Sequence, residues 1–228
     1  MQLRKQPVVF VHGVRTSSAI WDRQVEAMTR TGHPCVTVDL PGHGSRSDES
    51  FTLRSAFEAI DEGVRSVDGR PLLVGLSLGG YTSLAYAARH EGSVAGVVLA
   101  GCSTEIRGKP IGAYRTIARR VARVLRPSTH SWHLVTDMLA ALRGHSMLAD
   151  LRGLAVPVWL VNGQRDILRF GERRYIAANP GMRVAIVRRA GHDVNSHAPV
   201  AFNRILFGIT HELAASVRPV TRRLRPST

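Results

Sequence analysis

Short apolar runs recur along the chain, and longer stretches with apolar residues at helical spacing separate them. Six of these runs are rich in valine, leucine and isoleucine and are bounded by glycine, proline or charged residues, a pattern typical of buried strands. The runs occupy residues 7–11, 35–39, 71–75, 95–101, 156–161 and 183–188. The intervening helices are expected at residues 19–31, 52–67, 78–90, 170–178 and 198–215. Strands that alternate with helices predict an α/β fold with a mostly parallel six-stranded sheet flanked by helices.

Residues 75–79 carry the most informative motif, G-L-S-L-G, directly between the third apolar run and a helix-forming segment. A serine in a G-x-S-x-G motif between a strand and a helix is typical of a nucleophile elbow, a sharp turn that exposes the hydroxyl group. The flanking glycines remove side chains that would collide where the two backbones meet, and Gly80 adds further room. Ser77 is therefore the candidate nucleophile.

A serine hydroxyl needs a base, and the base needs an orienting acid. In the elbow architecture these follow the serine in the order acid, then histidine. Asp166 comes shortly after the fifth apolar run and His192 shortly after the sixth. We expect both at the carboxyl edge of the sheet beside Ser77. Asp193 and Asp137 are weaker candidates for the acid.

An oxyanion hole is expected from two backbone N–H groups. In this architecture one belongs to the residue after the nucleophile, here Leu78. The other comes from the loop after an early strand, and Val14, which follows the His12-Gly13 pair, is the simplest candidate.

Taken together, these blocks resemble the α/β-hydrolase-fold serine hydrolases over almost the full length of the chain. The matching segments are residues 10–13, 39–44, 75–80, 163–166 and 191–192, in family order. The resemblance implies that Asp39 and the turn after it, including His43, are structural, and that His12 shapes the oxyanion loop. Two strands that normally precede the His-Gly strand in this family are missing, so a minimal six-stranded version is expected. Related dehalogenases and epoxide hydrolases use aspartate at the elbow, and Ser77 argues against those two classes.

Residues 103–150 interrupt the alternation between the fourth and fifth strands, where members of this family carry a cap. Apolar residues between positions 111 and 125 share one helical face, and a second helix is expected from near Ser131. Most apolar side chains of this insertion must pack onto the main domain. The candidates for lining an acyl pocket are Tyr114, Trp132, Met138 and Leu139.

The formal net charge is +14, and all but two of the 31 basic residues are arginine. The basic residues are spread along the chain without interleaved aromatic residues, so nucleic acid is not an expected partner. A solvated arginine-rich surface and attraction to an anionic partner both remain open. We expect residues 1–217 to form one domain and the arginine-rich residues 218–228 to be disordered.

No apolar run is long enough for a transmembrane helix. The N-terminal residues lead into the first strand without room for a signal peptide, so a cytoplasmic location is expected. Cys35 and Cys102 are expected to be buried thiols, because disulfides are rare in that compartment. No Cys/His cluster has metal-ligand spacing, and the sequence leaves the oligomeric state open.

The function that these observations favour is hydrolysis of a carboxylic ester of a small or medium-sized substrate, through a Ser-His-Asp triad and an acyl-enzyme, without cofactor or metal. A thioesterase for acyl-CoA or acyl-carrier thioesters is the main alternative, because the cap is basic. A lyase or haloperoxidase would use the same triad. A ligand receptor with an inactive elbow is the non-enzymatic alternative.

Overall fold

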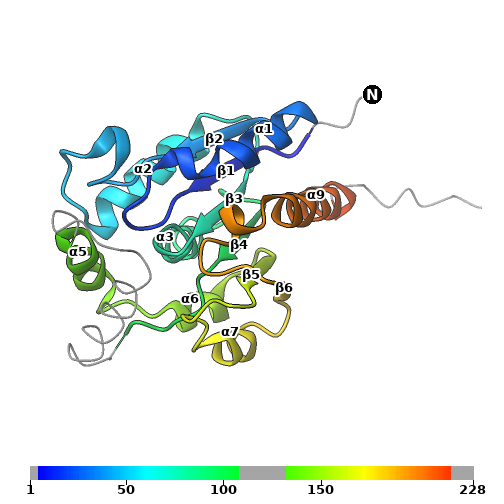
Figure 1. Ribbon diagram of the computed structural model, residues 1–228. Helices are drawn as coiled ribbons and strands as arrows, with labels where there is room; N and C mark the ends of the chain where they lie inside the picture. The colour runs from blue at the N-terminus through cyan, green and yellow to red at the C-terminus, as the bar shows by residue number, and fades with distance from the viewer. Residues whose placement is uncertain (1–4, 108–131, 217–228) are drawn as a thin grey trace, which may run out of the picture.

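The computed structural model describes residues 5–107 and 132–216 (Figure 1). Its centre is one six-stranded sheet with the order β2-β1-β3-β4-β5-β6, in which every neighbouring pair is parallel. The strands are β1 (Val8–Val11), β2 (Cys35–Val38), β3 (Leu72–Leu76), β4 (Gly96–Ala100), β5 (Val158–Gly163) and β6 (Arg183–Val187). The predicted α/β architecture is confirmed, and each strand lies within two residues of its expected position.

Helices cover both faces of the sheet, which explains why the inner strands read as continuous apolar runs. Every residue of β1, β3, β4 and β5 is buried. Successive side chains of β1 enter different cores, because side chains alternate across a strand. Val8 and Phe10 pack with Trp21 and Phe202, whereas Val9 packs in the core on the opposite face.

Each core is covered by its own set of helices. The core that contains Phe10 and Trp21 includes residues of a 3₁₀ turn (Ser18–Trp21), α1 (Asp22–Arg30) and α9 (Pro199–Ser216). The core that contains Val9 includes residues of α2 (Leu53–Arg65), α3 (Leu78–Ala87), α6 (Met147–Gly153) and α7 (Glu172–Ala178). Every residue of α3 is buried, so the helix that follows the elbow is an internal one. This placement fixes the elbow against the sheet.

The insertion between β4 and β5 contains α5 (Trp132–Leu142), the second expected cap helix, and α6. Two short helices, α6 and the single turn α8 (Val194–His197), differ from the pattern expected from the sequence. The helix expected over residues 19–31 is divided into the 3₁₀ turn and α1. These elements are too short to show a helical period. The expected helix over residues 111–125 and the expected tail lie outside the described residues.

Cys102 is buried and Cys35 is half-buried, and both are free thiols. Within residues 5–107 and 132–216, no helix has the length and apolar character needed to cross a membrane.

Candidate active site

Ser77 occupies a sharp turn between β3 and α3, with backbone angles of φ 50° and ψ −113°. Both flanking glycines are required by contact. A Cβ on Gly75 would lie 2.3 Å from the carbonyl oxygen of Gly79, and one on Gly79 would lie 2.2 Å from that of Val11. The Ser77 N–H donates to the carbonyl of Ala100 on β4 at 2.8 Å. The left-handed turn is thus held by backbone contacts with both neighbouring strands.

Asp166 and His192 meet directly. The Nδ1 of His192 lies 3.0 Å from the Oδ2 of Asp166, and the other carboxylate oxygen accepts the Leu168 N–H at 2.8 Å. The Asp166 side chain is 1% exposed and the His192 side chain 24% exposed. This bond assigns the Nδ1 proton to the carboxylate and leaves Nε2 of the neutral ring as an acceptor. The imidazole is therefore oriented and still accessible.

The surroundings of His192 act on its pKa in opposite directions. Burial opposes the charged ring and lowers the pKa, but the hydrogen bond and charge of Asp166, together with the charge of Asp193, outweigh burial. The net result is a pKa above the ordinary value of 6.5. The ring can hold a proton more firmly than a free histidine.

The loops that carry Asp166 and His192 are joined to one another. The Arg165 N–H donates to the carbonyl of Ala190 at 2.8 Å. A Cβ on Gly163 would lie 2.1 Å from the carbonyl of Gly191, so only glycine fits at the end of β5. Because the two loops share these contacts, the acid and the base are positioned as one unit.

The end of β4 connects this unit to the elbow. Gly101 has a φ of +56°, and a Cβ there would lie 2.8 Å from the carbonyl of His192 and 3.3 Å from its ring. The preceding residue, Ala100, accepts the Ser77 N–H. Ser77 therefore contacts Ala100 and His192 contacts Gly101, which are consecutive residues at the end of β4.

The loop after β1 lies against the elbow from the other side. A Cβ on Gly13 would be 3.5 Å from the Cβ of Ser77. Among the described residues, neither the Val14 nor the Leu78 N–H donates to a protein acceptor. Leu78 is the first residue of α3, where the helix dipole adds positive potential. Both candidate oxyanion donors are thus free of protein acceptors within residues 5–107 and 132–216.

His12 holds the loop after β1 in place through two hydrogen bonds. It is fully buried, its Nδ1 donates to the carbonyl of Gly13 at 2.7 Å, and its Nε2 accepts the Leu40 N–H at 2.9 Å. Burial is the main cause that lowers the pKa of His12 to about 4. A ring that is neutral at pH 7 and uses both nitrogens in the protein suits a structural role.

Asp39 and His43 stabilise the neighbouring turn. Asp39 accepts the N–H groups of Ser18 at 2.7 Å and Ser45 at 3.0 Å. Burial raises the pKa of Asp39, but these hydrogen bonds prevail and lower it to about 2. The Nε2 of His43 accepts the Arg15 N–H at 3.0 Å, so His43 also holds the loop after β1.

His197 is a positioning contact that the sequence analysis did not single out. Its Nδ1 accepts the Gly191 N–H at 3.1 Å, immediately before His192. The two other carboxylates considered for the acid lie elsewhere: Asp193 precedes α8, and Asp137 is exposed on α5. Asp166 is the one that reaches the ring.

The candidate pocket residues of the insertion are only partly described. Met138 is buried and Leu139 half-buried, and both pack in the core that contains α2 and α3. Tyr114 and the side chain of Trp132 lie outside the described residues. Their contact with an acyl chain stays a prediction.

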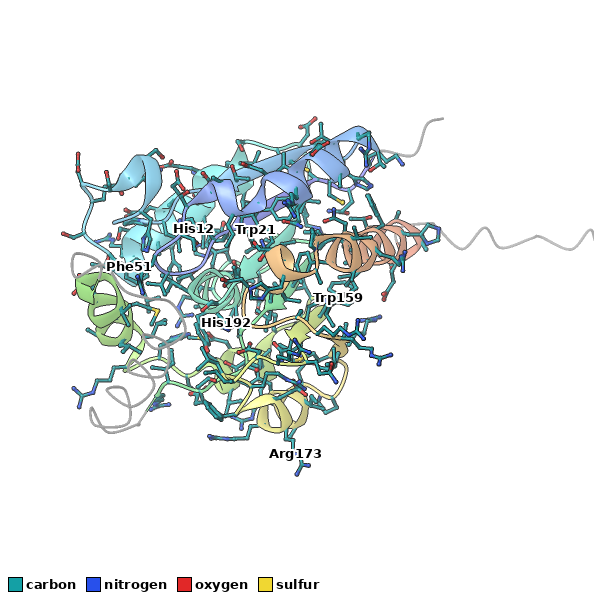
Figure 2. All side chains as sticks on the ribbon, viewed as in Figure 1. His12, Trp21, Phe51, Trp159, Arg173 and His192 are labelled. Atoms are coloured by element: carbon teal, nitrogen blue, oxygen red, sulfur yellow. The ribbon has the colours of Figure 1, made fainter. Side chains whose placement is uncertain are left out.

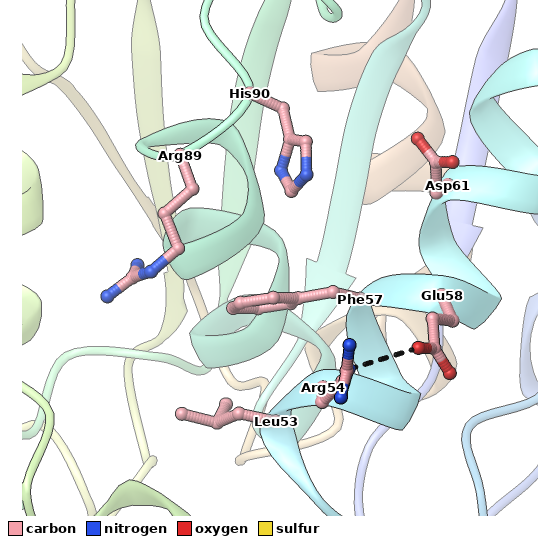
Figure 3. A pocket seen from close by; sticks show the side chains of 7 residues that line it. All are labelled: Leu53, Arg54, Phe57, Glu58, Asp61, Arg89 and His90. Carbon is pink, nitrogen blue, oxygen red and sulfur yellow. Dashed lines mark ion pairs between the residues drawn. The ribbon is translucent and has the colours of Figure 1, made fainter.

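A pocket of about 440 Å³ lies between α2 and the residues after α3 (Figure 3). It is lined by Leu53, Arg54, Phe57, Glu58, Asp61, Arg89 and His90. The ten residues of α3, about 15 Å of helix, separate this end from Ser77. Arg54 is paired with Glu58, and Arg89 lies over the Phe57 ring. The pocket is therefore remote from the elbow, and its cations are already engaged.

No group of three or more His, Cys, Asp or Glu side chains able to hold a metal ion occurs in the part of the chain that the structure describes. Figure 2 shows His12 and His192 toward the middle of the molecule and Arg173 pointing outward from α7. The site thus contains a hydroxyl, an oriented imidazole and a buried carboxylate, the three chemical groups that an acyl-transfer triad requires.

Comparison with known proteins identifies the family of the chain. The family described as "Alpha/beta hydrolase family" matches residues 8–205. Esterase Rv0045c of Mycobacterium tuberculosis is 33% identical over 96 residues, which are 40% of this chain and 31% of that protein. A pimeloyl-[acyl-carrier protein] methyl ester esterase of Neisseria meningitidis is 26% identical over 224 residues, 81% of this chain and 70% of that protein.

The first of these relatives is matched over about a third of its own length. Among solved structures, a carboxylesterase of Nitrososphaera gargenis superposes with a TM-score of 0.74 at 17% identity, covering 95% of this chain and 93% of that one. A likeness at this identity reflects the shared fold.

Proposed function

Because the chain belongs to the alpha/beta hydrolase family, we propose that it is a serine hydrolase that cleaves a carboxylic ester of a small or medium-sized substrate. The observation that carries the proposal is the hydrogen bond between Asp166 and His192, beside a serine held in the left-handed turn of an elbow. An accessible imidazole oriented by a buried carboxylate is the arrangement that activates a serine hydroxyl.

In the proposed reaction, the Oγ of Ser77 attacks the ester carbonyl while Nε2 of His192 takes the hydroxyl proton. Asp166 holds the imidazole in the required tautomer and stabilises the imidazolium that forms. The N–H groups of Val14 and Leu78 bind the negative oxygen of the tetrahedral intermediate. The intermediate collapses and expels the alcohol, which receives the proton from His192 and leaves an acyl-enzyme.

Deacylation repeats these steps with water. His192 removes a proton from the water as it attacks the acyl carbonyl, and returns it to Ser77 as the acid product leaves. Both acylation and deacylation require His192 to be neutral before it takes the proton and charged in the tetrahedral intermediate. The raised pKa of His192 favours its charged form, which is the form present in the intermediate.

The relatives support ester chemistry by their names, an esterase and a methyl ester esterase. The second acts on a substrate joined to an acyl carrier protein, and this chain carries a net charge of +14. These two observations favour a thioesterase for acyl-CoA or acyl-carrier thioesters as the second candidate, since both carriers are anionic.

The test is a panel of p-nitrophenyl esters of increasing acyl length, run beside acyl-CoA thioesters of the same lengths. We expect ester turnover in the wild type, its loss in Ser77→Ala, and its retention in Ser216→Ala, which removes an exposed hydroxyl at the end of α9. Higher kcat/KM for the thioesters would select the second candidate. Turnover of neither series by folded protein would contradict both.

A further inference from the structure

Three arginines among residues 5–107 and 132–216 are partly buried: Arg15, Arg46 and Arg169. Two of them have carboxylate partners. Arg46 lies 3.1 Å from Glu49, and Arg169 lies 2.8 Å from Glu172. The Arg15 guanidinium is different, because it makes no ion pair, side-chain hydrogen bond or aromatic stacking contact with the described residues, and its Nε is buried without a partner.

The unsatisfied Nε of Arg15 is unfavourable in the free protein. A guanidinium stays charged at any accessible pH, so it cannot escape the cost of burial by losing a proton. Arg15 is only partly buried, and its unfavourable atom is Nε, because an N–H that is buried without a partner loses water and gains no hydrogen bond in return. An anion that entered beside Arg15 would supply the missing hydrogen bonds, and the fork of the guanidinium suits a carboxylate or phosphate.

The backbone places Arg15 next to the candidate reaction centre. It follows Val14, the candidate oxyanion donor, in the loop that brings Gly13 against Ser77. Arg15 itself has a φ of 62°, a left-handed conformation unusual for a residue other than glycine, and its N–H is held by His43. Such strain persists where the surrounding structure enforces it, often at functional sites.

We propose that Arg15 is a specificity-determining residue that binds an anionic group of the substrate, a carboxylate or a phosphate, so that the preferred ester is negatively charged. The inference rests on the proposed function and names the substrate class of the same site. The net charge of +14 attracts anions to the whole surface, so the effect of Arg15 must be separated from that general attraction.

The experiment compares mono-p-nitrophenyl glutarate with p-nitrophenyl valerate, which have the same leaving group and acyl length but end in a carboxylate and a methyl group. We expect the ratio of their kcat/KM values to fall about 10- to 100-fold in Arg15→Gln, because hydrogen bonds to charged groups contribute roughly 1.5–3 kcal/mol and each 1.4 kcal/mol is tenfold. Arg173→Gln removes the same charge from an exposed position on α7 and should leave the ratio unchanged.

Arg15→Lys provides a second variant if Arg15→Gln does not fold, and its ratio should be intermediate, because lysine keeps the charge and loses the fork. Inhibition of p-nitrophenyl valerate hydrolysis by glutarate and by inorganic phosphate distinguishes the two anions. The inhibition constant of the stronger inhibitor should increase at least tenfold in Arg15→Gln. Equal ratios in the folded Arg15 variants and Arg173→Gln would overturn the inference while leaving ester hydrolysis intact.

Failure of the proposed function gives a different result. Calorimetric binding of glutarate and of phosphate to Ser77→Ala and to Ser77→Ala with Arg15→Gln requires no turnover. A tenfold weaker Kd for either anion in the double variant would support the anion site even if no ester were cleaved. Equal affinity of the two proteins for both anions, or binding to neither, would overturn it.

Discussion

The carboxylate of Asp166 lies 3.0 Å from Nδ1 of His192 and is 1% exposed, whereas the imidazole it orients keeps 24% of its surface open. The charged carboxylate is thus buried in the protein, whereas the imidazole that would accept the proton is accessible from solvent. This relationship sets both the pH range in which the proposed base works and the dependence of the site on its acid.

The pH dependence of kcat/KM follows from this pair. His192 must be neutral to accept a proton, and its pKa lies above 6.5. Activity should therefore rise with pH through an apparent pKa above 6.5. Asp166→Asn removes the charge that raises this pKa, so the midpoint should move to lower pH and kcat should fall, on the order of 10⁴-fold. A rate profile with a maximum near pH 4 to 5 would point to carboxylate chemistry instead.

The proposed triad should behave as one unit in mutant kinetics. Ser77→Ala and His192→Ala should each reduce kcat on the order of 10⁶-fold, and the double variant should lose little beyond either single change. Steady-state rates of the three variants on one p-nitrophenyl ester measure this directly. Multiplicative losses in the double variant would show that the two residues act independently.

The elbow glycine at position 79 should not tolerate a side chain. In Gly79→Ala the new Cβ would lie 2.2 Å from a backbone oxygen of β1, so we expect a loss of more than about 4 kcal/mol in unfolding free energy. Gly208→Ala is the matched control, because its Cβ meets nothing within 4 Å in the interior of α9. That variant should gain about 0.5–1 kcal/mol. Urea unfolding of both variants and the wild type measures whether the unfolding free energy decreases in the first variant and increases in the second.

His12 should make stability depend on pH. Its pKa is about 4 in the folded protein and 6.5 as an ordinary value, so between these pH values the unfolded chain binds a proton that the folded protein excludes. Stability should therefore decrease as the pH falls from 6.5 to 4, by up to about 3 kcal/mol from this residue. His192 has the opposite sign, because its raised pKa stabilises the fold at low pH and that contribution is lost as the pH rises through it.

Comparison with His12→Gln isolates the His12 contribution. The variant should show a smaller loss of unfolding free energy than the wild type over the same pH interval, whatever its stability at pH 7. An identical slope in both proteins would mean that His12 is protonated in the folded state.

The sequence predicted the parts of the fold that depend on local pattern. The inner strands are buried on both faces and therefore read as apolar runs, and the elbow requires glycine at fixed positions around Ser77. Roles that arise from long-range contacts left no such signal. His197 holds the loop that carries His192 because α8 brings its ring to Gly191. Arg15 stands out only once its buried Nε is known to have no hydrogen-bond partner among the described residues. Neither residue lies in a recognisable motif.

The most direct test of the account is covalent labelling by a fluorophosphonate, which reacts with an activated serine and needs no knowledge of the substrate. We predict that intact-mass measurement shows one phosphonyl group on the wild type, that peptide mapping places it on Ser77, and that labelling is absent in Ser77→Ala and strongly slowed in His192→Ala. A folded wild-type protein that stays unlabelled, or a label carried by another residue with full ester turnover in Ser77→Ala, would contradict the proposed mechanism.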